Sequence, residues 1–149
     1  MSQLKFTIRS SPVFAEHRTV YKIAQVLLIL HYCCRSSHAS LPKLQLFNWG
    51  LKSDSRRLIL LNAAQKNNLN IPTWGFDPLL TIAVNFAIAD NLISSTKTGY
   101  QVTEKGSIYA NAILEDIEIM QKDKSMLKSI GKGITESMIE TITKSWTSQ

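Results

Sequence analysis

The side chains that could hold a metal ion gather in one short segment. His31, Cys33, Cys34 and His38 have metal-like spacing, and on a helix residues 31, 34 and 38 would share one side. Structural zinc sites usually take paired ligands from turns at two or more places in the chain. Buried cysteines and a histidine at the edge of the core are the commoner arrangement, so we expect no metal and no cofactor.

Two further kinds of chemistry find little support in the sequence. Residues 129–135 are similar to a phosphate-binding loop, but the first glycine of that motif is missing and no strand precedes it. No Ser-His-Asp or Cys-His-Asn arrangement can be assembled, because the aspartates are better explained as helix caps or helix ends. We therefore expect a protein that is not an enzyme and that takes no small-molecule substrate.

The elements that would position these side chains are mostly helices. Apolar residues recur at helical spacing on two sides of residues 14–35, which predicts a helix buried between neighbours. Ser40, Asp77 and Thr103 are predicted N-caps. The expected helices cover about residues 14–35, 40–50, 54–67, 77–90, 103–130 and 134–146. In the helix at 103–130, the residues expected to face inward are Tyr109, Ala112, Ile113, Ile117 and Met120.

The most specific local pattern lies between residues 77 and 121. A helix is followed by a predicted strand at 92–95, a tight turn, a returning strand at 100–102 and another helix. This order is typical of a winged helix-turn-helix domain, in which the hairpin is the wing. The predicted fold class is therefore mainly α with a small β-hairpin wing: a winged helix-turn-helix-like domain plus C-terminal helices. A plain α+β domain with one hairpin is the alternative.

The length of the chain favours one domain with flanking segments. With 149 residues, 44% of them apolar, it can bury a core without disulfides or metal. We expect an N-terminal arm at 1–13, the winged-helix-like domain at 14–122 and a C-terminal helical extension at 123–149. The extension carries an apolar stripe that must be covered by this domain or by a partner chain. The stripe consists of Ile134, Met138, Ile142 and Trp146.

Nothing in the sequence predicts a membrane span or a secretion signal. The strongest apolar run, residues 23–30, is interrupted by Gln25, whereas a span needs about 20 apolar residues. The only two cysteines are adjacent, which is too close for the usual disulfide geometry and indicates a reducing compartment. We therefore expect a cytoplasmic protein that does not contact a membrane.

The net charge of +6 is distributed unevenly. Residues 1–75 carry ten Lys and Arg against two Asp and Glu, whereas residues 76–149 carry seven against nine. A basic half of this kind often meets a polyanion or an acidic protein surface, although an ordinary solvated surface would have the same composition. The basic residues that could contact a nucleic-acid backbone are Lys43, Lys52, Arg56, Arg57, Lys66 and Lys97.

The helix just before the wing is poorly suited to reading DNA. In a winged helix it normally enters the major groove through polar and basic side chains. Here residues 77–90 contain no Lys or Arg and are bounded by two aspartates. Because phosphate contacts supply much of DNA affinity, any DNA contact is expected to be independent of sequence and to come from other elements.

Trp and Arg are enriched at protein interfaces, which singles out candidates for partner binding. Trp49 lies close in sequence to two arginines. Core packing is the default for any one tryptophan, but three interior tryptophans would be many for a chain of this length. The partner-binding candidates are Trp49, Arg56, Arg57 and Trp146.

Four segments between residues 20 and 106 together resemble a known family. They are VYKIAQVLLIL at 20–30, ASLPKLQLFNWGLKS at 39–53, the Asp-Pro helix start at 77–78, and LISS with GYQVTEKG within 92–106. In this order they resemble the middle component of the ABC-three-component systems, the bacterial anti-phage group that includes Lamassu. The block LPKLQLFNWGL is the more specific part, since the wing motif is generic to winged helices.

The resemblance implies a small, non-catalytic adaptor subunit. Such a subunit would assemble with an SMC-like ATPase and a separate effector, commonly a nuclease, to sense foreign DNA, and could contact the DNA backbone within that complex. No catalytic residues carry over from the family. The alternative is a winged-helix DNA-binding transcriptional regulator, dimeric through its terminal helices.

Overall fold

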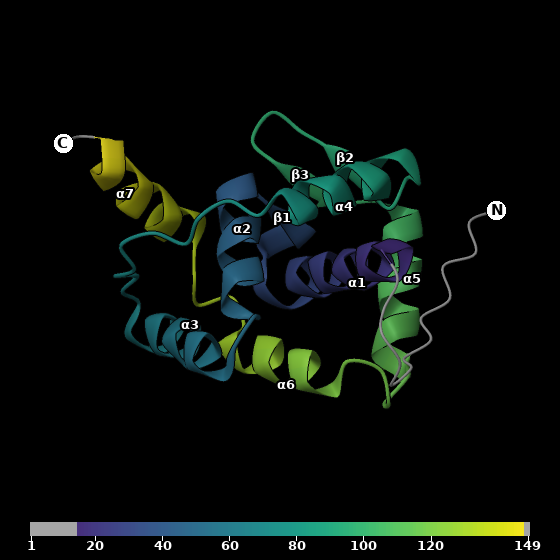
Figure 1. The fold of residues 1–149 in the computed structure, drawn as a ribbon, viewed down its shortest axis with the longest axis horizontal. Coiled ribbons are helices and arrows are strands. Elements are labelled where there is room, and N and C mark those ends of the chain that lie inside the picture. The colour runs from purple at the N-terminus through teal and green to yellow at the C-terminus, as the bar shows by residue number, and fades with distance from the viewer. Residues whose placement is uncertain (1–14, 148–149) are drawn as a thin grey trace.

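The computed structural model describes residues 15–147, which form helices and three short strands (Figure 1). The helices are α1 (Ala15–Cys33), α2 (Leu41–Gly50), α3 (Asp54–Lys66), α4 (Pro78–Ala89), α5 (Glu104–Glu115), α6 (Gln121–Ile130) and α7 (Glu136–Thr147). The strands are β1 (His38–Ala39), β2 (Ile93–Ser95) and β3 (Tyr100–Val102). The predicted fold class, mainly α with a small β wing, is confirmed. The arm expected at 1–13 lies outside the described residues.

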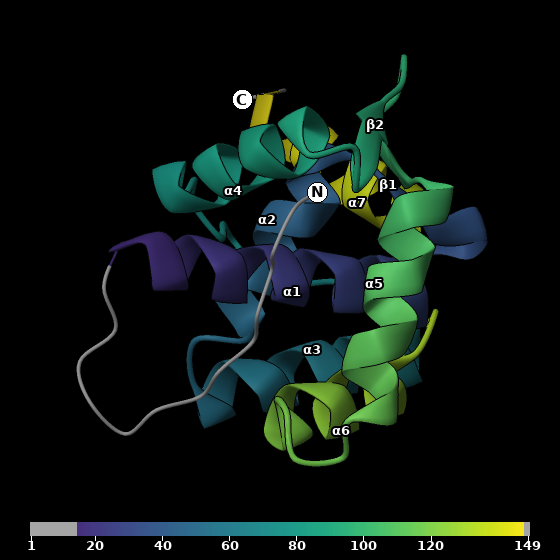
Figure 2. The ribbon, with the colours of Figure 1, turned by 90° about the vertical axis from the view of Figure 1, so that its right-hand side faces the viewer.

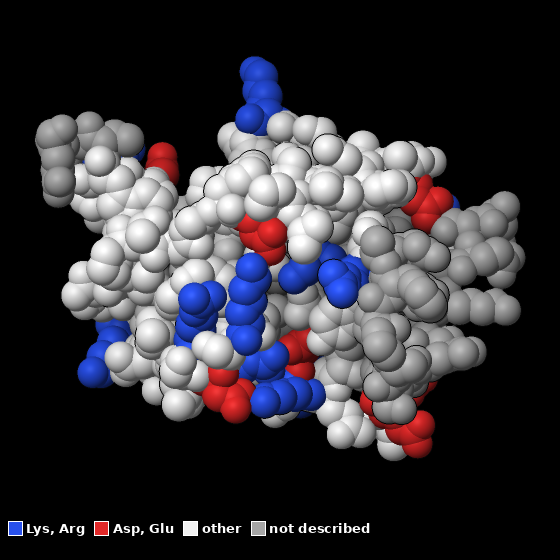
Figure 3. Space-filling model, in the orientation of Figure 1, with Lys and Arg blue, Asp and Glu red and all other residues white. Residues whose placement is uncertain are grey.

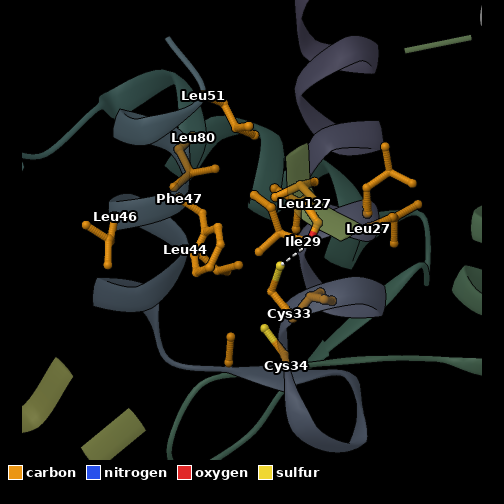
Figure 4. Close-up of a cluster of buried hydrophobic side chains, with 14 of the residues drawn as sticks. Leu27, Ile29, Cys33, Cys34, Leu44, Leu46, Phe47, Leu51, Leu80 and Leu127 are labelled. Atoms are coloured by element: carbon orange, nitrogen blue, oxygen red, sulfur yellow. Dashed lines mark hydrogen bonds between the residues drawn. The ribbon is translucent and has the colours of Figure 1, made fainter. Parts of the chain in front are cut away.

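Helix α1 is the centre of the fold. It is buried without interruption over residues 23–30, as its two apolar stripes predicted. Helix α4 packs on one side of α1, and α6 packs on another together with α3 (Figure 2). The side chains of Cys33 and Cys34 are free thiols inside this core, close to Leu44 and Phe47 of α2 (Figure 4).

The three strands form one antiparallel sheet in the order β1-β3-β2. The hairpin of β2 and β3 is the predicted wing, with Ile93 opposite Val102. Strand β1 was not predicted, because two residues are too few to show an alternating pattern. It pairs with β3, and His38 Nε2 lies 2.9 Å from Thr96 Oγ1 in the wing turn. The start of the wing turn is therefore tied to β1.

Short polar side chains set where the helices begin. Ser40, Asp77 and Thr103 each accept a hydrogen bond from a backbone N–H in the first turn of their helix, which confirms the three predicted N-caps. Ser53 does the same for α3. Asn67 ends α3 in a left-handed conformation, where an asparagine is tolerated.

The order α1, β1, α2, α4, β2, β3 follows a winged helix, but α3 is added between α2 and α4. A helix-turn-helix usually joins its two helices by a turn of about 3–4 residues, whereas residues 51–77 separate α2 from α4. Part of this connector is buried, with Leu69, Ile71 and Trp74 in the core. The insertion therefore belongs to the same packed body.

The expected helix over 103–130 is two helices. Residues 116–120 form a turn, and Met120 has a positive φ of 53° just before α6. The turn lets α6 fold back against α1 and α3, with Leu127 and Ile130 buried. Of the residues expected to face inward, Ile113 and Met120 are buried, but Ile117 is 80% exposed and Ala112 is also exposed. Ile117 lies beyond the end of α5, where the helical period no longer applies, whereas Ala112 lies within α5 on its exposed side.

The last helix packs on this domain. Ile134 and Ile139 are buried, and Met138 and Ile142 pack partly against the core. Glu136 accepts hydrogen bonds from the backbone N–H and the hydroxyl of Ser40, at 2.9 and 2.7 Å, so it joins α7 to the start of α2. The boundary expected at residues 122 and 123 falls within α6. In residues 15–147 no helix is both long enough and apolar enough to cross a membrane.

Candidate partner-binding surface

The outer side of α4 is apolar, and an exposed phenylalanine lies two residues before the helix. Leu80, Ala83, Val84 and Ala87 form the buried side of the helix, which leaves the opposite side to solvent. On that solvent side Leu79, Ile82 and Phe86 follow one another at helical spacings of three and four, and they are 56%, 44% and 58% exposed. Phe76, which comes just before the N-cap Asp77, is 63% exposed. We call these four residues the α4 ridge.

No charge interrupts the α4 ridge. The other exposed positions of the helix are Pro78, Asn85 and Ala89. Ion pairs stand only at its two ends, Lys52 with Asp77 at 3.0 Å and Lys105 with Asp90 at 3.4 Å. An apolar strip with polar residues at its rim is the arrangement that marks protein interaction sites.

Helix α2 fixes the start of α4 through one side of its own surface. The Gln45 side chain bonds both the backbone N–H and the carbonyl of Asp77, at 2.9 and 3.3 Å. Asn48 and Lys52 donate to the Asp77 carboxylate at 2.9 and 3.0 Å. Gln45 and Asn48 lie on one side of α2 because of their helical spacing, and Lys52 follows two residues after the end of the helix. The α4 ridge therefore begins on a rigid base.

The electrostatics at this base follow from burial and hydrogen bonds. Partial burial raises the pKa of Asp77, but hydrogen bonds from Asn48, Lys52 and the Leu79 N–H outweigh it, so the pKa lies below its ordinary value. Burial lowers the pKa of Lys22, against the attraction of Asp77. Lys22 also donates to Asn48 at 2.7 Å. Two ammonium groups thus share the neighbourhood of one carboxylate.

Basic side chains gather beside the α4 ridge. Figure 3 shows blue atoms gathered on the lower half of the face, whereas the upper half, where α4 and the wing lie, is mostly white apart from blue atoms at its top. Lys52 and Arg56 are four residues apart around the start of α3. Arg56 lies over the ring of Trp49, with 4.9 Å from its guanidinium carbon to the ring centroid. The structure therefore brings together Trp49 and Arg56, two of the four partner-binding candidates.

Two of the basic candidates are buried, which corrects their expected place on the surface. Lys43 is 3% exposed, and its ammonium donates to the carbonyl of Cys33 at the end of α1. Arg57 is 7% exposed and donates to Asp123 at 2.7 Å and to the carbonyl of Leu51. Both side chains donate hydrogen bonds to acceptors in the interior, so neither is available to contact a phosphate backbone.

Asp123 is the hub of a buried polar cluster. Besides Arg57, Tyr21 and Gln25 donate to its carboxylate at 2.7 and 3.1 Å. Burial, together with the hydrogen bond to Asp123, raises the pKa of the Tyr21 hydroxyl. The Nε and Nη1 atoms of Arg57 find no hydrogen-bond partner in the described chain. The guanidinium therefore depends on Asp123 for its charge compensation.

The remaining candidates lie in separate places. Trp146 is 37% exposed and meets Trp74 edge-on, with 4.6 Å between ring centroids. Trp74 donates to the carbonyl of Pro42 in the first turn of α2, at the opposite end of that helix from Trp49. Lys66 ends α3 and Lys97 lies in the wing turn, both exposed. These cations do not line one groove with Lys52 and Arg56.

The cysteine-containing segment gives no metal geometry. Among the described residues, no three His, Cys, Asp or Glu side chains are placed to hold one ion. Burial raises the pKa of Cys34 to about 11 and that of Cys33 further. Cys33 donates to the carbonyl of Leu127 at 3.4 Å (Figure 4), as expected for a core thiol.

Sequence reasoning missed the α4 ridge itself. Residues 77–90 contain no Lys or Arg, which argues against DNA. Apolar residues lie on every side of this helix, so the sequence pattern does not reveal which side is exposed to solvent. The packing of α4 against α1 determines the exposed side. No protein-family model, curated protein or solved structure matches the chain. The surface of the winged-helix-like domain is therefore the evidence for its function.

Proposed function

We propose that this chain is a non-catalytic adaptor subunit that binds a larger protein through the α4 ridge. The observation that carries the proposal is the exposed apolar side of the helix before the wing. With about 200 Å² for a large side chain, four side chains that are about half exposed present roughly 400 Å². The largest apolar patch of a typical monomer has about this size and is often functional.

The chemistry of the ridge favours protein over DNA. A helix that enters the major groove needs donors and cations for phosphates and base edges. The α4 ridge would instead cover phosphates with four apolar side chains. Burying the same side chains against an apolar partner surface is favourable, at roughly 25 cal/mol per Å².

The resemblance of the sequence to the middle component of ABC-three-component systems supplies the kind of partner. In this proposal the chain joins an SMC-like ATPase and an effector of the nuclease type in a bacterial anti-phage complex. ATP hydrolysis and cleavage would then belong to the other subunits, and DNA backbone contact, where it occurs, to Lys52 and Arg56.

The test is co-purification of the tagged chain from its native host, with and without nuclease treatment. Wild type should recover a long coiled-coil ATPase under both conditions, and Phe86→Ser should lower that recovery by at least about tenfold. Ile108→Ser makes a similar change on α5, where Ile108 is 65% exposed, and should leave recovery unchanged. The proposal is wrong if no ATPase is recovered or if the two variants behave alike.

A DNA-binding regulator is the second candidate, favoured only by the exposed Lys52 and the half-buried Arg56 beside it. It predicts salt-dependent binding to a defined duplex that is lost in the Lys52→Ala, Arg56→Ala double variant. Arg57 does not belong in this test, because its removal would disturb the core. Recovery of one enriched DNA site without a protein partner would favour the regulator.

A further inference from the structure

We infer that the segment covering the α4 ridge is an amphipathic helix with carboxylates at one end. This inference rests on the proposed function and names the chemistry of the partner. The exposed side chains of the α4 ridge require a partner segment with an apolar side. Within the helix, Leu79, Ile82 and Phe86 extend over about two turns, and a partner helix would match them with apolar residues at spacings of three and four.

The two ends of the ridge differ in charge. At the Phe76 end, Lys22 and Lys52 lie beside the carboxylate of Asp77. The other carboxylate that attracts Lys22, Asp123, is paired with Arg57. At the Phe86 end, Lys105 and Asp90 pair one to one. Among the side chains that the structure describes, residues 18–146, neither Lys22 nor Arg56 forms an ion pair. The Phe76 end is therefore net positive, and the carboxylates of the partner helix belong there.

The same charges argue against a second copy of this chain. Two α4 helices packed antiparallel would bury about 800 Å² in total, below the roughly 1,200 Å² of a standard interface. They would also set each positive end against the neutral Lys105–Asp90 end of the other copy. An acidic amphipathic helix would pair with the cations and also bury the apolar residues, whereas duplex DNA would pair only with the cations.

The experiment selects peptides from a displayed random library of about 16 residues, long enough for about four turns, on the immobilised full chain. The expected result is enrichment of apolar residues at spacings of three and four with Asp or Glu clustered at one end. Ile82→Ser should abolish binding of the enriched peptides, Lys52→Glu should weaken it by about tenfold, and Lys52→Gln by less. Ile108→Ser and Lys97→Glu are the matched controls.

The outcomes separate this inference from the proposed function. Peptides that need Ile82 but carry no acidic end, or that ignore both Lys52 variants, would overturn the acidic helix and leave the α4 ridge as a docking site. Selection of no peptide, or of peptides indifferent to Ile82→Ser, would overturn the inference, while ATPase recovery by wild type and its loss in Phe86→Ser still decide the adaptor. Tighter binding of anionic vesicles or a short duplex than of any peptide, lost in Ile82→Ser, would assign the surface to a membrane or to DNA.

Discussion

Asp123 shows how one buried carboxylate can join three helices. It comes from α6 and accepts hydrogen bonds from Tyr21 and Gln25 of α1 and from Arg57 of α3. Removal of one partner of a buried pair leaves the other charge uncompensated. Helix spacing alone gives no sign of this contact, because Arg57 and Asp123 are far apart in sequence. The sequence therefore predicted a surface arginine where the structure has a buried one.

We expect Asp123→Ala to lower the free energy of unfolding by about 3–5 kcal/mol, measured by urea denaturation. The loss follows from leaving the Arg57 guanidinium buried without its counter-ion. Lys122→Ala is the control, because Lys122 pairs with the exposed Asp54 at the surface and such pairs contribute little. Equal unfolding midpoints for Asp123→Ala and wild type would contradict the account.

The ionisation of Asp77 should make the free energy of unfolding depend on pH in the acid range. Because its pKa is lowered in the folded state, ionised Asp77 stabilises the fold above the ordinary aspartate pKa, and this contribution is lost as pH falls through the lowered value. Asp77→Asn keeps an N-cap but cannot titrate. The difference in unfolding free energy between wild type and variant should be present at about pH 7 and shrink at about pH 3. A difference that stays constant would show that the carboxylate charge is not involved.

Cys33 and Cys34 should be unreactive in the folded protein. With a pKa of about 11, roughly one Cys34 in a thousand would be a thiolate at about pH 8, and burial also blocks access. A thiol reagent such as dithionitrobenzoate should label neither cysteine in native protein and both after denaturation. Rapid labelling of the native protein would mean that this part of the core opens.

At the scale of elements, the sequence predicted those features that depend only on residues close together in the chain. The caps at Ser40, Asp77 and Thr103 follow from side chains that bond their own helix, so the sequence alone sufficed. Strand β1 and the break between α5 and α6 depend on partners distant in sequence. A two-residue strand exists only because β3 pairs with it, and the turn at 116–120 exists because α6 folds back onto α1 and α3.

Gly106 fixes how closely α5 approaches Leu92, the residue just before β2. A Cβ added there would overlap the carbonyl oxygen of Leu92. Glycine to alanine within a helix normally gains about 1 kcal/mol, but here the overlap should reverse the sign and destabilise by about 1–3 kcal/mol. Thermal unfolding of Gly106→Ala beside Ser107→Ala, an exposed neighbour in the same turn, measures the effect. Stabilisation by both variants would refute the close approach.

At the scale of the whole molecule, the inner and outer sides of α4 follow from the position of α1. The sequence predicted a helix without cations before the wing and therefore a partner other than sequence-specific DNA. It could not predict that Leu79, Ile82 and Phe86 would meet solvent, since apolar residues also fill the inner side. The contact between Trp49 and Arg56 joins residues that are close in sequence, so it could be expected. The contact between Trp146 and Trp74 joins residues far apart in sequence, and only the fold reveals it.

Photo-crosslinking in the native host tests the central claim most directly. Benzoylphenylalanine in place of Ile82 puts a reactive group on the α4 ridge, and the same group in place of Ile108 puts it on an exposed site of α5. The account predicts one large protein adduct from position 82 and none from position 108. No adduct from position 82, or the same adducts from both positions, would contradict a docking role for α4.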